Sequence, residues 1–182
     1  MICRIFQSLG VSVYDADNRA KEIMITDPVL IEEIKKEFGM QAFFPDGKIN
    51  RDLIAQKVFD APEQLEKLNH LVHPRVQLDY TQWLERHRNE PYVIKEAALI
   101  FEAGTSPGLN TIIVVSAPEA LRLKRVLLRD SHRTEKDVIK IFHNQMTEEE
   151  KLKRADAVIV NDESRLVIPQ VLELHKRFIA RS

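Results

Sequence analysis

The hydrophobic pattern alternates between short apolar runs and longer stretches with helical periodicity. In the longer stretches apolar residues recur every three or four positions, which is typical of amphipathic helices. Residues 112–115 form an unbroken apolar run, which favours a strand that is covered on both faces. Strands separated by helices favour βαβ units and a parallel sheet. The expected strands are residues 11–14, 92–94, 111–115 and 157–160.

Capping residues and prolines predict where the helices begin. Asn50 caps a helix whose apolar spacing runs to Phe59, and Pro74 should restart a helix after His73 because proline cannot continue the hydrogen-bond ladder. Thr134 and Thr147 each have an acidic residue three positions later, as a capping box requires. The other expected helix starts are Met1, Asp27 with Pro28, Pro62 and Pro118.

The length of the helical segments predicts the domain organisation. The segment between the first two expected strands is too long for one crossover helix, so residues 18–90 are interpreted as an inserted helical lobe that holds a substrate. A second, charge-rich excursion over residues 131–154 comes late in the chain, where mobile lids are found. The whole chain, residues 1–182, is expected to form a single domain.

Composition excludes several classes of function. The 27 basic and 28 acidic residues nearly cancel, which argues against nucleic-acid binding and against binding to acidic membranes. Cys3 is the only cysteine, so neither an internal disulfide nor a thiolate metal cluster can form. No apolar run approaches the length of a membrane span and no signal pattern opens the chain, which predicts a cytoplasmic protein. The five glycines do not form a phosphate-binding loop motif.

Three carboxylates follow expected strands and are candidates for chemistry. Asp15 and Asp17 follow the first strand and, in extended chain, would point to the same side. The carboxyl ends of parallel strands form the ligand crevice of open α/β sheets, where a carboxylate can accept a proton or hold a metal through water. Glu96 follows the second strand in the same way. The alternative for each is a carboxylate that only favours the start of a helix.

Three arginines, Arg122, Arg125 and Arg129, share one face of a predicted helix because they are three and four residues apart. With Arg133 and Lys140 from the excursion, they could neutralise the charge on a transferred phosphoryl group. The alternative is a solvated helix face that forms salt bridges with neighbouring acids, the candidates being Glu119, Asp130 and Glu135.

Motifs spread over nearly the whole chain resemble those of the dephospho-coenzyme A kinase family. Each motif alone is weak, but their order and spacing together are specific. The main ones are Asp15-Ala16-Asp17, Asp46-Gly47-Lys48-Ile49-Asn50-Arg51, Leu71-Val72-His73-Pro74, Leu99-Ile100-Phe101-Glu102 and Ala155-Asp156-Ala157-Val158-Ile159-Val160-Asn161. Ala98 stands where the family usually has proline.

The resemblance implies a fold, a reaction and residue roles. Family members are P-loop kinases of the α/β class, with a parallel sheet flanked by helices, and they use ATP and Mg²⁺ to phosphorylate the ribose 3′-hydroxyl of dephospho-CoA. By this resemblance Asp17 is the general base, and Asp15 lies beside it near the metal. The remaining assignments are Arg125 and Arg129 to catalysis, His73, Arg75 and Glu96 to the substrate, and Arg133, Lys140 and Asn161 to the nucleotide.

The start of the chain departs from the family pattern. Family members open with a strand, central in the sheet, and a glycine-rich loop; about 15 residues of this kind are not found before Met1. We therefore expect that Met1 is internal to a longer product and that the 182-residue chain by itself is inactive. Intact protein from the source cells should then be heavier than 21.1 kDa by mass spectrometry, and a mass equal to that value would contradict the expectation.

Two alternatives to an active dephospho-CoA kinase stay open from the sequence. One is another P-loop kinase for a small molecule, which a panel of substrates would identify. The other is a catalytically dead homologue that binds coenzyme A, which would bind dephospho-CoA without ATP. The sequence leaves open whether the protein forms a homo-oligomer.

Overall fold

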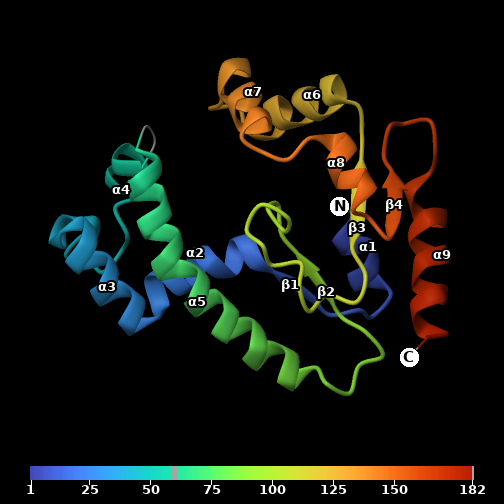
Figure 1. Cartoon of the computed structure of the whole chain (residues 1–182), viewed down its shortest axis with the longest axis horizontal. Helices are drawn as coiled ribbons and strands as arrows, with labels where there is room; N and C mark the ends of the chain where they lie inside the picture. Colours follow the sequence, from blue (N-terminus) through green and yellow to red (C-terminus); the bar gives the residue numbers. More distant parts are fainter. Residues whose placement is uncertain (59–60, 182) are drawn as a thin grey trace. The chain divides into compact units, whose positions relative to one another are not determined.

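The computed structural model describes residues 1–58 and 61–181, which divide into two compact units. One unit joins residues 1–10 to residues 98–182, and the other consists of residues 11–97. In the described residues, each unit has two parallel strands with helices packed against them, so the α/β class expected from the sequence is confirmed (Figure 1). The second unit contains the segment expected to form the helical lobe, residues 18–90, together with the strands before and after it.

The unit of residues 11–97 has a parallel sheet of β1 (Val13–Asp15) and β2 (Ile94–Glu96). The register pairs Val13 with Ile94 and Asp15 with Glu96, so the two strands end side by side. Both strands lie close to the segments expected from the hydrophobic pattern, shifted by about two residues. Tyr14, in the middle of β1, is 1% exposed and is the largest fully buried side chain among the described residues.

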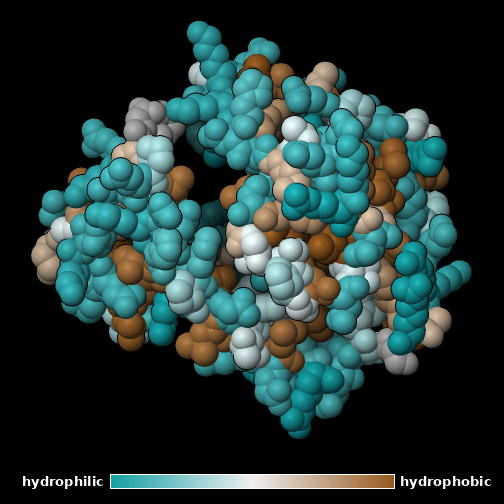
Figure 2. Space-filling model, in the orientation of Figure 1, coloured by the Kyte–Doolittle hydropathy of each residue, from teal (hydrophilic) through white to brown (hydrophobic). Residues whose placement is uncertain are grey.

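The helices of this unit share one hydrophobic core. Aliphatic and aromatic residues at helical spacing, such as Leu30, Ile34 and Phe38, turn one face of a helix inward, and all three are at most 1% exposed. Figure 2 shows a mostly hydrophilic surface over α3 and α4, as expected for the opposite faces. The helices are α2 (Ala16–Thr26), α3 (Pro28–Phe38), the short 3₁₀ turn η1 (Met40–Ala42), α4 (Arg51–Val58) and α5 (Pro62–Arg86).

The expected helix boundary at Pro74 is wrong, because α5 continues through it as a single helix of 25 residues. An interior proline removes the hydrogen bond to the carbonyl four residues earlier and its ring crowds that carbonyl, at a cost of about 3 kcal/mol that packing elsewhere along the helix can offset. Burial of Leu68 and Val72 in the shared core holds the helix together just before this position. Helix α4 begins after Asn50, whose side chain accepts a hydrogen bond from the Leu53 N–H, as expected. Its expected end at Phe59 lies outside the described residues.

The other unit pairs β3 (Ile113–Ser116) with β4 (Ala157–Val160), again in parallel. Helix α1 (Ile2–Ser8) packs on α9 (Val167–Ile179), so the start of the chain lies beside its last described helix (Figure 1). Phe6, Val138, Ile159 and Val171 are its most deeply buried side chains. The helices between the strands are α6 (Glu119–Arg129), α7 (Glu135–His143) and α8 (Glu148–Lys153).

Strand β3 is less covered than its unbroken apolar run predicts. Val115 is 42% exposed, and no residue of β3 is buried. The expectation that this strand is covered on both faces is therefore wrong for the described residues. In the described part of the chain β4 is the one strand paired with β3, so side chains of a second neighbouring strand do not shield the faces of β3. Within residues 1–58 and 61–181, no helix is long and apolar enough to span a membrane.

The local capping signals were predicted correctly. Thr134 and Thr147 form complete capping boxes with Asp137 and Glu150, and each pair exchanges side-chain and backbone hydrogen bonds. Asp27 caps α3 by accepting bonds from the N–H groups of residues 29 and 30 at 3.0 and 3.1 Å. These signals can be recognised in the sequence because every bond joins residues at most three positions apart.

Asp27 also binds an arginine of α5. Arg75 donates from Nε and Nη2 to the Asp27 Oδ2 atom at 2.7 and 2.5 Å, which ties the start of α3 to α5. Partial burial alone would raise the pKa of Asp27, but the α3 N–H groups and Arg75 together lower it below its ordinary value of 3.8. Folding therefore favours the ionised form of this carboxyl group.

The substitution Asp27→Asn should lower the free energy of unfolding at pH 7 by about 1–2 kcal/mol, because asparagine still caps the helix but loses the charged pair with Arg75. Since folding lowers the pKa of Asp27, this stabilisation is present above pH 3.8 and is lost as the pH falls through the lower folded-state value. Urea unfolding from pH 7 to pH 3 should show a smaller acid-induced loss in the variant. Arg75→Gln should give the same loss at pH 7, and the two losses should not add. Equal acid sensitivity of variant and parent would contradict the assignment.

Candidate functional site

The strand ends of the residue 11–97 unit bring three carboxylates together. Asp15 and Glu96 end paired strands and are register partners, although they are 81 positions apart in the chain. Neighbouring strands lie about 4.8 Å apart, so the backbones of these two residues are adjacent. Asp17 follows in the first turn of α2. Parallel pairing therefore places Glu96 beside Asp15, and Asp17 lies two residues further along the chain from Asp15.

The expectation that Asp15 and Asp17 point to the same side of an extended strand is wrong, because the strand ends before Asp17. Strand β1 ends at Asp15, which caps α2 by accepting the Asn18 N–H at 3.0 Å, while its second oxygen accepts the Asn18 side-chain amide at 2.6 Å. Asp17 is already helical. The correction has a local cause, since the Asp15 cap starts the helix before the chain reaches Asp17.

The three carboxylates differ in the hydrogen bonds that they form with other residues. Asp15 is engaged as a helix cap through both oxygens. Among the described residues, no hydrogen bond or ion pair involves the side chains of Asp17 and Glu96, and both residues are exposed. Asp17 and Glu96 thus have carboxylate oxygens available to a ligand at the carboxyl edge of the sheet.

A divalent cation fits this donor set only with a small number of protein ligands. In the described part of the chain, no group of three or more His, Cys, Asp or Glu side chains is arranged to hold a metal ion. Mg²⁺ commonly keeps several waters and binds one or two carboxylates together with substrate phosphates. A carboxylate has about four lone-pair positions, so Asp15 can cap its helix and still accept a water from a hydrated ion.

In the other unit the structure brings Arg125 and Asn161 together. The Arg125 Nη1 atom donates to the Asn161 backbone carbonyl at 2.8 Å, and Nη2 lies 3.2 Å from Glu163. The Asn161 N–H in turn donates to the carbonyl of Ser116, the last residue of β3, at 2.8 Å. Arg125 therefore holds the segment that follows β4 against the carboxyl ends of both strands.

A cleft of about 410 Å³ opens beside these strand ends. Arg122 contributes to its wall, with its guanidinium 5.0 Å from the centre of the Phe142 ring and 3.2 Å from Glu148. The Arg122 Nε and Glu148 Oε1 atoms are buried and have no hydrogen-bond partner among the described residues. Such orphaned polar groups are costly unless water or a ligand satisfies them. The other lining residues are Ser116, Ala117, Pro118, Glu119, Val160 and Asp162.

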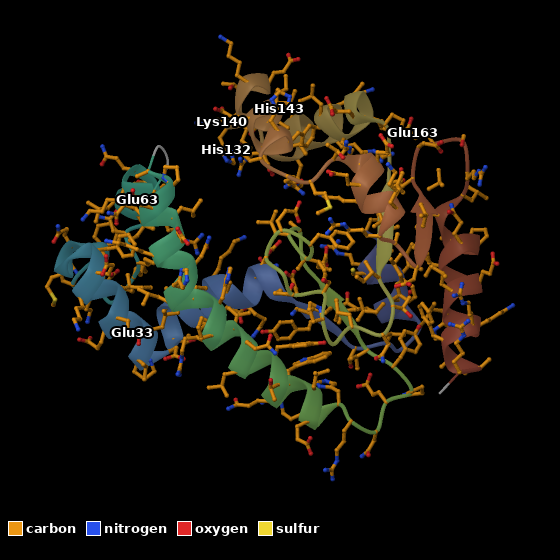
Figure 3. All side chains as sticks on the ribbon, viewed as in Figure 1. Glu33, Glu63, His132, Lys140, His143 and Glu163 are labelled. Atoms are coloured by element: carbon orange, nitrogen blue, oxygen red, sulfur yellow. The ribbon has the colours of Figure 1, made fainter. Side chains whose placement is uncertain are left out.

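Two of the remaining expected phosphate ligands are bonded to an acid in the structure. Arg129 donates from Nε and Nη2 to both oxygens of Asp130 at 2.9 Å, and Arg133 lies 3.5 Å from the same carboxylate. These contacts are among those that the alternative of a solvated, salt-bridged face predicted. Figure 3 shows Lys140 on α7, away from the loop after β4 that carries Glu163.

The expected substrate-binding residues of α5 are not gathered into one site. His73 as a whole is exposed, but the protein removes part of the water around its ring, and this lowers its pKa. Repulsion from His70 lowers the pKa further. Arg75 is bonded to Asp27 as described above. A shallow cleft of about 370 Å³ between α3 and α5 is lined by Glu37, Lys67 and His70 but not by His73.

Sequence reasoning missed a set of residues that surround the first strand. Tyr14 and Arg19 both bind Asp79 of α5, and Ser12 donates to Glu90 at 2.7 Å. The partners are 60 to 78 positions apart. Only the four-residue spacing of Arg75 and Asp79 on a helix could have drawn attention to this region, and it indicates the wrong partner for Asp79.

Comparison with known proteins gives one consistent family. The model of the family CoaE, dephospho-CoA kinase, matches residues 1–166. The dephospho-CoA kinase of Bacteroides fragilis is 33% identical over 174 residues, which cover 96% of this chain and 84% of the relative. That of Chlorobaculum tepidum is 38% identical over 167 residues, with 88% and 79% covered.

Solved structures agree with the sequence comparison. TT1252 from Thermus thermophilus superposes with a TM-score of 0.84 at 31% identity, over 97% of this chain and 88% of that protein. Dephospho-CoA kinase from Campylobacter jejuni gives a TM-score of 0.71 at 26% identity, over 98% and 90%. The motifs, the parallel strands flanked by helices and these matches lead to one conclusion: the chain belongs to the dephospho-CoA kinase family.

Proposed function

We propose that this protein is an ATP-dependent kinase that transfers the γ-phosphoryl group of ATP to the ribose 3′-hydroxyl of dephospho-CoA in the cytoplasm. Family membership supports the reaction, and one structural observation supports the site. Asp15 and Glu96 lie side by side at the carboxyl edge of a parallel sheet, with Asp17 two residues further on. Ligands of open α/β sheets bind at that edge.

Asp17 acts as the general base in this proposal. The 3′-hydroxyl must lose its proton as its oxygen attacks the γ-phosphorus, and a carboxylate within hydrogen-bond reach can accept that proton. Asp17 suits the role because its oxygens are exposed and have no partner among the described residues. Its position in the first turn of α2 favours a negative charge through the helix dipole.

Asp15 would hold a hydrated Mg²⁺ ion, and Glu96 would orient the substrate from the adjacent strand. When bound, Mg²⁺ neutralises charge that develops on the phosphate oxygens. The Asp15 carboxylate fits a hydrated ion because it keeps acceptor positions beyond the two hydrogen bonds of its helix cap. The Asp15 cap also fixes the point at which the strand becomes a helix, and this places Asp17 in the first turn of α2.

Nucleotide binding belongs to the unit that contains β3 and β4. Asn161 and the adjoining cleft take the adenosine part of ATP, since 410 Å³ lies within the usual range for small-molecule pockets. Arg125 holds the Asn161 segment and contributes positive charge toward the phosphates. Arg129, Arg133 and Lys140 supply further positive charge from α6 and from the lid, residues 131–154. Arg129 and Arg133 would exchange Asp130 for phosphate oxygens.

The helical lobe, residues 18–90, takes dephospho-CoA. His73 and Arg75 of α5 are assigned to this substrate together with Glu96. His73 is exposed and its pKa is lowered, so at neutral pH it is an uncharged group that can donate or accept a hydrogen bond. Arg75 can donate a hydrogen bond to the substrate while it remains bonded to Asp27, because its Nη1 atom is not used in that pair.

The reaction is tested by measuring ADP release with Mg·ATP and dephospho-CoA, using the protein as its source cells make it. Formation of ADP and coenzyme A in equal amounts is expected. Binding of dephospho-CoA without ADP release would indicate a catalytically dead homologue, and turnover with a different acceptor from a substrate panel would indicate another small-molecule kinase. Either result would overturn the proposed reaction.

Asp17→Asn should lower kcat about 10²–10⁴-fold, because the attacking hydroxyl loses its proton acceptor, while KM values change little. Asp52→Asn is the matched control, since Asp52 is likewise an exposed carboxylate in the first turn of a helix, α4. Both variants lose a similar, small helix-dipole stabilisation, but the control should keep its turnover. A loss in Asp17→Asn smaller than about tenfold would remove Asp17 from the role of base.

Arg125→Ala should raise KM for ATP about tenfold or more and leave KM for dephospho-CoA nearly unchanged, since Arg125 holds the Asn161 segment beside the proposed nucleotide cleft. Lys124→Ala removes the neighbouring cation of α6, which is exposed, and serves as the control. Steady-state kinetics with each substrate varied in turn measures the effect. Equal changes in both KM values would contradict a role confined to the nucleotide.

A further inference from the structure

A single carboxylate on α5, Asp79, binds residues on both sides of the segment Asp15–Asp17. Tyr14, directly before the segment, donates its hydroxyl to Asp79 Oδ2 at 2.8 Å. Arg19, two residues after it, donates from Nε to Oδ2 at 3.0 Å and from Nη2 to Oδ1 at 2.6 Å. The strand end and the first turns of α2 are therefore both attached to one side chain that lies 60 or more positions away.

The surroundings of Asp79 favour a fixed geometry. Its side chain is 17% exposed, and the Arg19 fork uses both of its oxygens, an arrangement that specifies direction as well as distance. Tyr14 is buried against Tyr80 and Trp83, with ring centres 4.9 and 5.4 Å away. The phenol and the guanidinium thus meet the same carboxylate from two different elements, β1 and α2.

Protonation states keep this network intact at neutral pH. The hydrogen bond from Arg19 lowers the pKa of Asp79, so the carboxylate stays ionised. Burial raises the pKa of Tyr14, and the hydrogen bond to Asp79 raises it further, so the phenol remains a donor. Three charge-assisted bonds therefore persist over the range in which an enzyme of this kind operates.

These contacts bear on catalysis because general-base chemistry depends on small displacements. A shift of about 1 Å in a reacting group can cost on the order of 10²-fold in rate. Asp17 lies in the first turn of α2, between the two residues that Asp79 holds. A rotation of that turn about the Asp15 cap would move the Asp17 carboxylate, and the Tyr14 and Arg19 bonds resist such a rotation.

We propose that Asp79 is a positioning residue, which fixes the Asp15–Asp17 segment through Tyr14 and Arg19 so that the Asp17 carboxylate meets the hydroxyl of the substrate. The proposal rests on the proposed role of Asp17 as the base. In this proposal Asp79 acts through Tyr14 and Arg19, to which its two oxygens are bonded, and not on the substrate itself. Its contribution should accordingly appear in kcat and only when Asp17 is present.

The test compares Asp79→Asn in two backgrounds, using the protein as its source cells make it. In the parent, Asp79→Asn should lower kcat about 10–100-fold and leave KM for ATP within about threefold. In the Asp17→Asn background the same substitution should cause no further loss beyond about twofold, because the base that it positions is gone. Glu85→Gln is the matched control: Glu85 lies on the same helix and pairs with Arg88, but both side chains are 69% exposed.

Three further variants separate positioning from loss of structure. Tyr14→Phe keeps the aromatic packing and removes only the hydroxyl, and should lower kcat about 3–10-fold with near-ultraviolet circular dichroism unchanged. Arg19→Lys keeps the charge without the fork and should retain more turnover than Arg19→Ala. Equal losses from Asp79→Asn in the parent and in Asp17→Asn would overturn the positioning role. Full turnover in Asp17→Asn would instead refute the proposed base.

Discussion

Parallel pairing of β1 with β2 is the constraint on which the residue 11–97 unit depends. Parallel strands cannot be joined by a tight turn, so the chain must travel a long way before it returns to the sheet. Here it passes through helices α2 to α5, and α5 ends shortly before β2. The same pairing places Asp15 beside Glu96. The lobe and the carboxylate edge are therefore two consequences of one strand arrangement.

The Asp15 cap converts that arrangement into a candidate site. A capping carboxylate ends the strand and begins the helix within a single residue, so Asp17 is helical and its side chain leaves the sheet in a direction set by α2. Its neighbours Tyr14 and Arg19 then meet Asp79 on α5. Local capping gives the position of the turn, and the long-range network holds it against the body of the unit.

The unit with β3 and β4 follows the same physical logic with different groups. Its strands also end side by side, with the Asn161 N–H bonded to the Ser116 carbonyl. In this unit Arg125 holds the segment after β4, just as Asp79 holds the end of β1 and the start of α2 in the unit of residues 11–97. Beside the cleft, Arg122 and Glu148 each keep one buried polar atom without a hydrogen-bond partner among the described residues.

The amino-acid sequence by itself determined the family, the α/β class, the positions of the strands along the chain to within about two residues, and most helix starts. Those features depend on periodicity and on bonds between residues a few positions apart, such as the capping boxes of Thr134 and Thr147. The tertiary structure decided other features, namely that α5 passes through Pro74 and that β3 is only partly covered.

The tertiary structure also decided the partner of each charge, Arg75 with Asp27 and Arg19 with Asp79. A charged side chain pairs with whatever the fold brings within about 4 Å. Residues 48 and 60 positions apart carry no periodic signal that could predict such a pair. Local structure could therefore be predicted from the sequence, while the assembly of the candidate site required the long-range contacts of the folded chain.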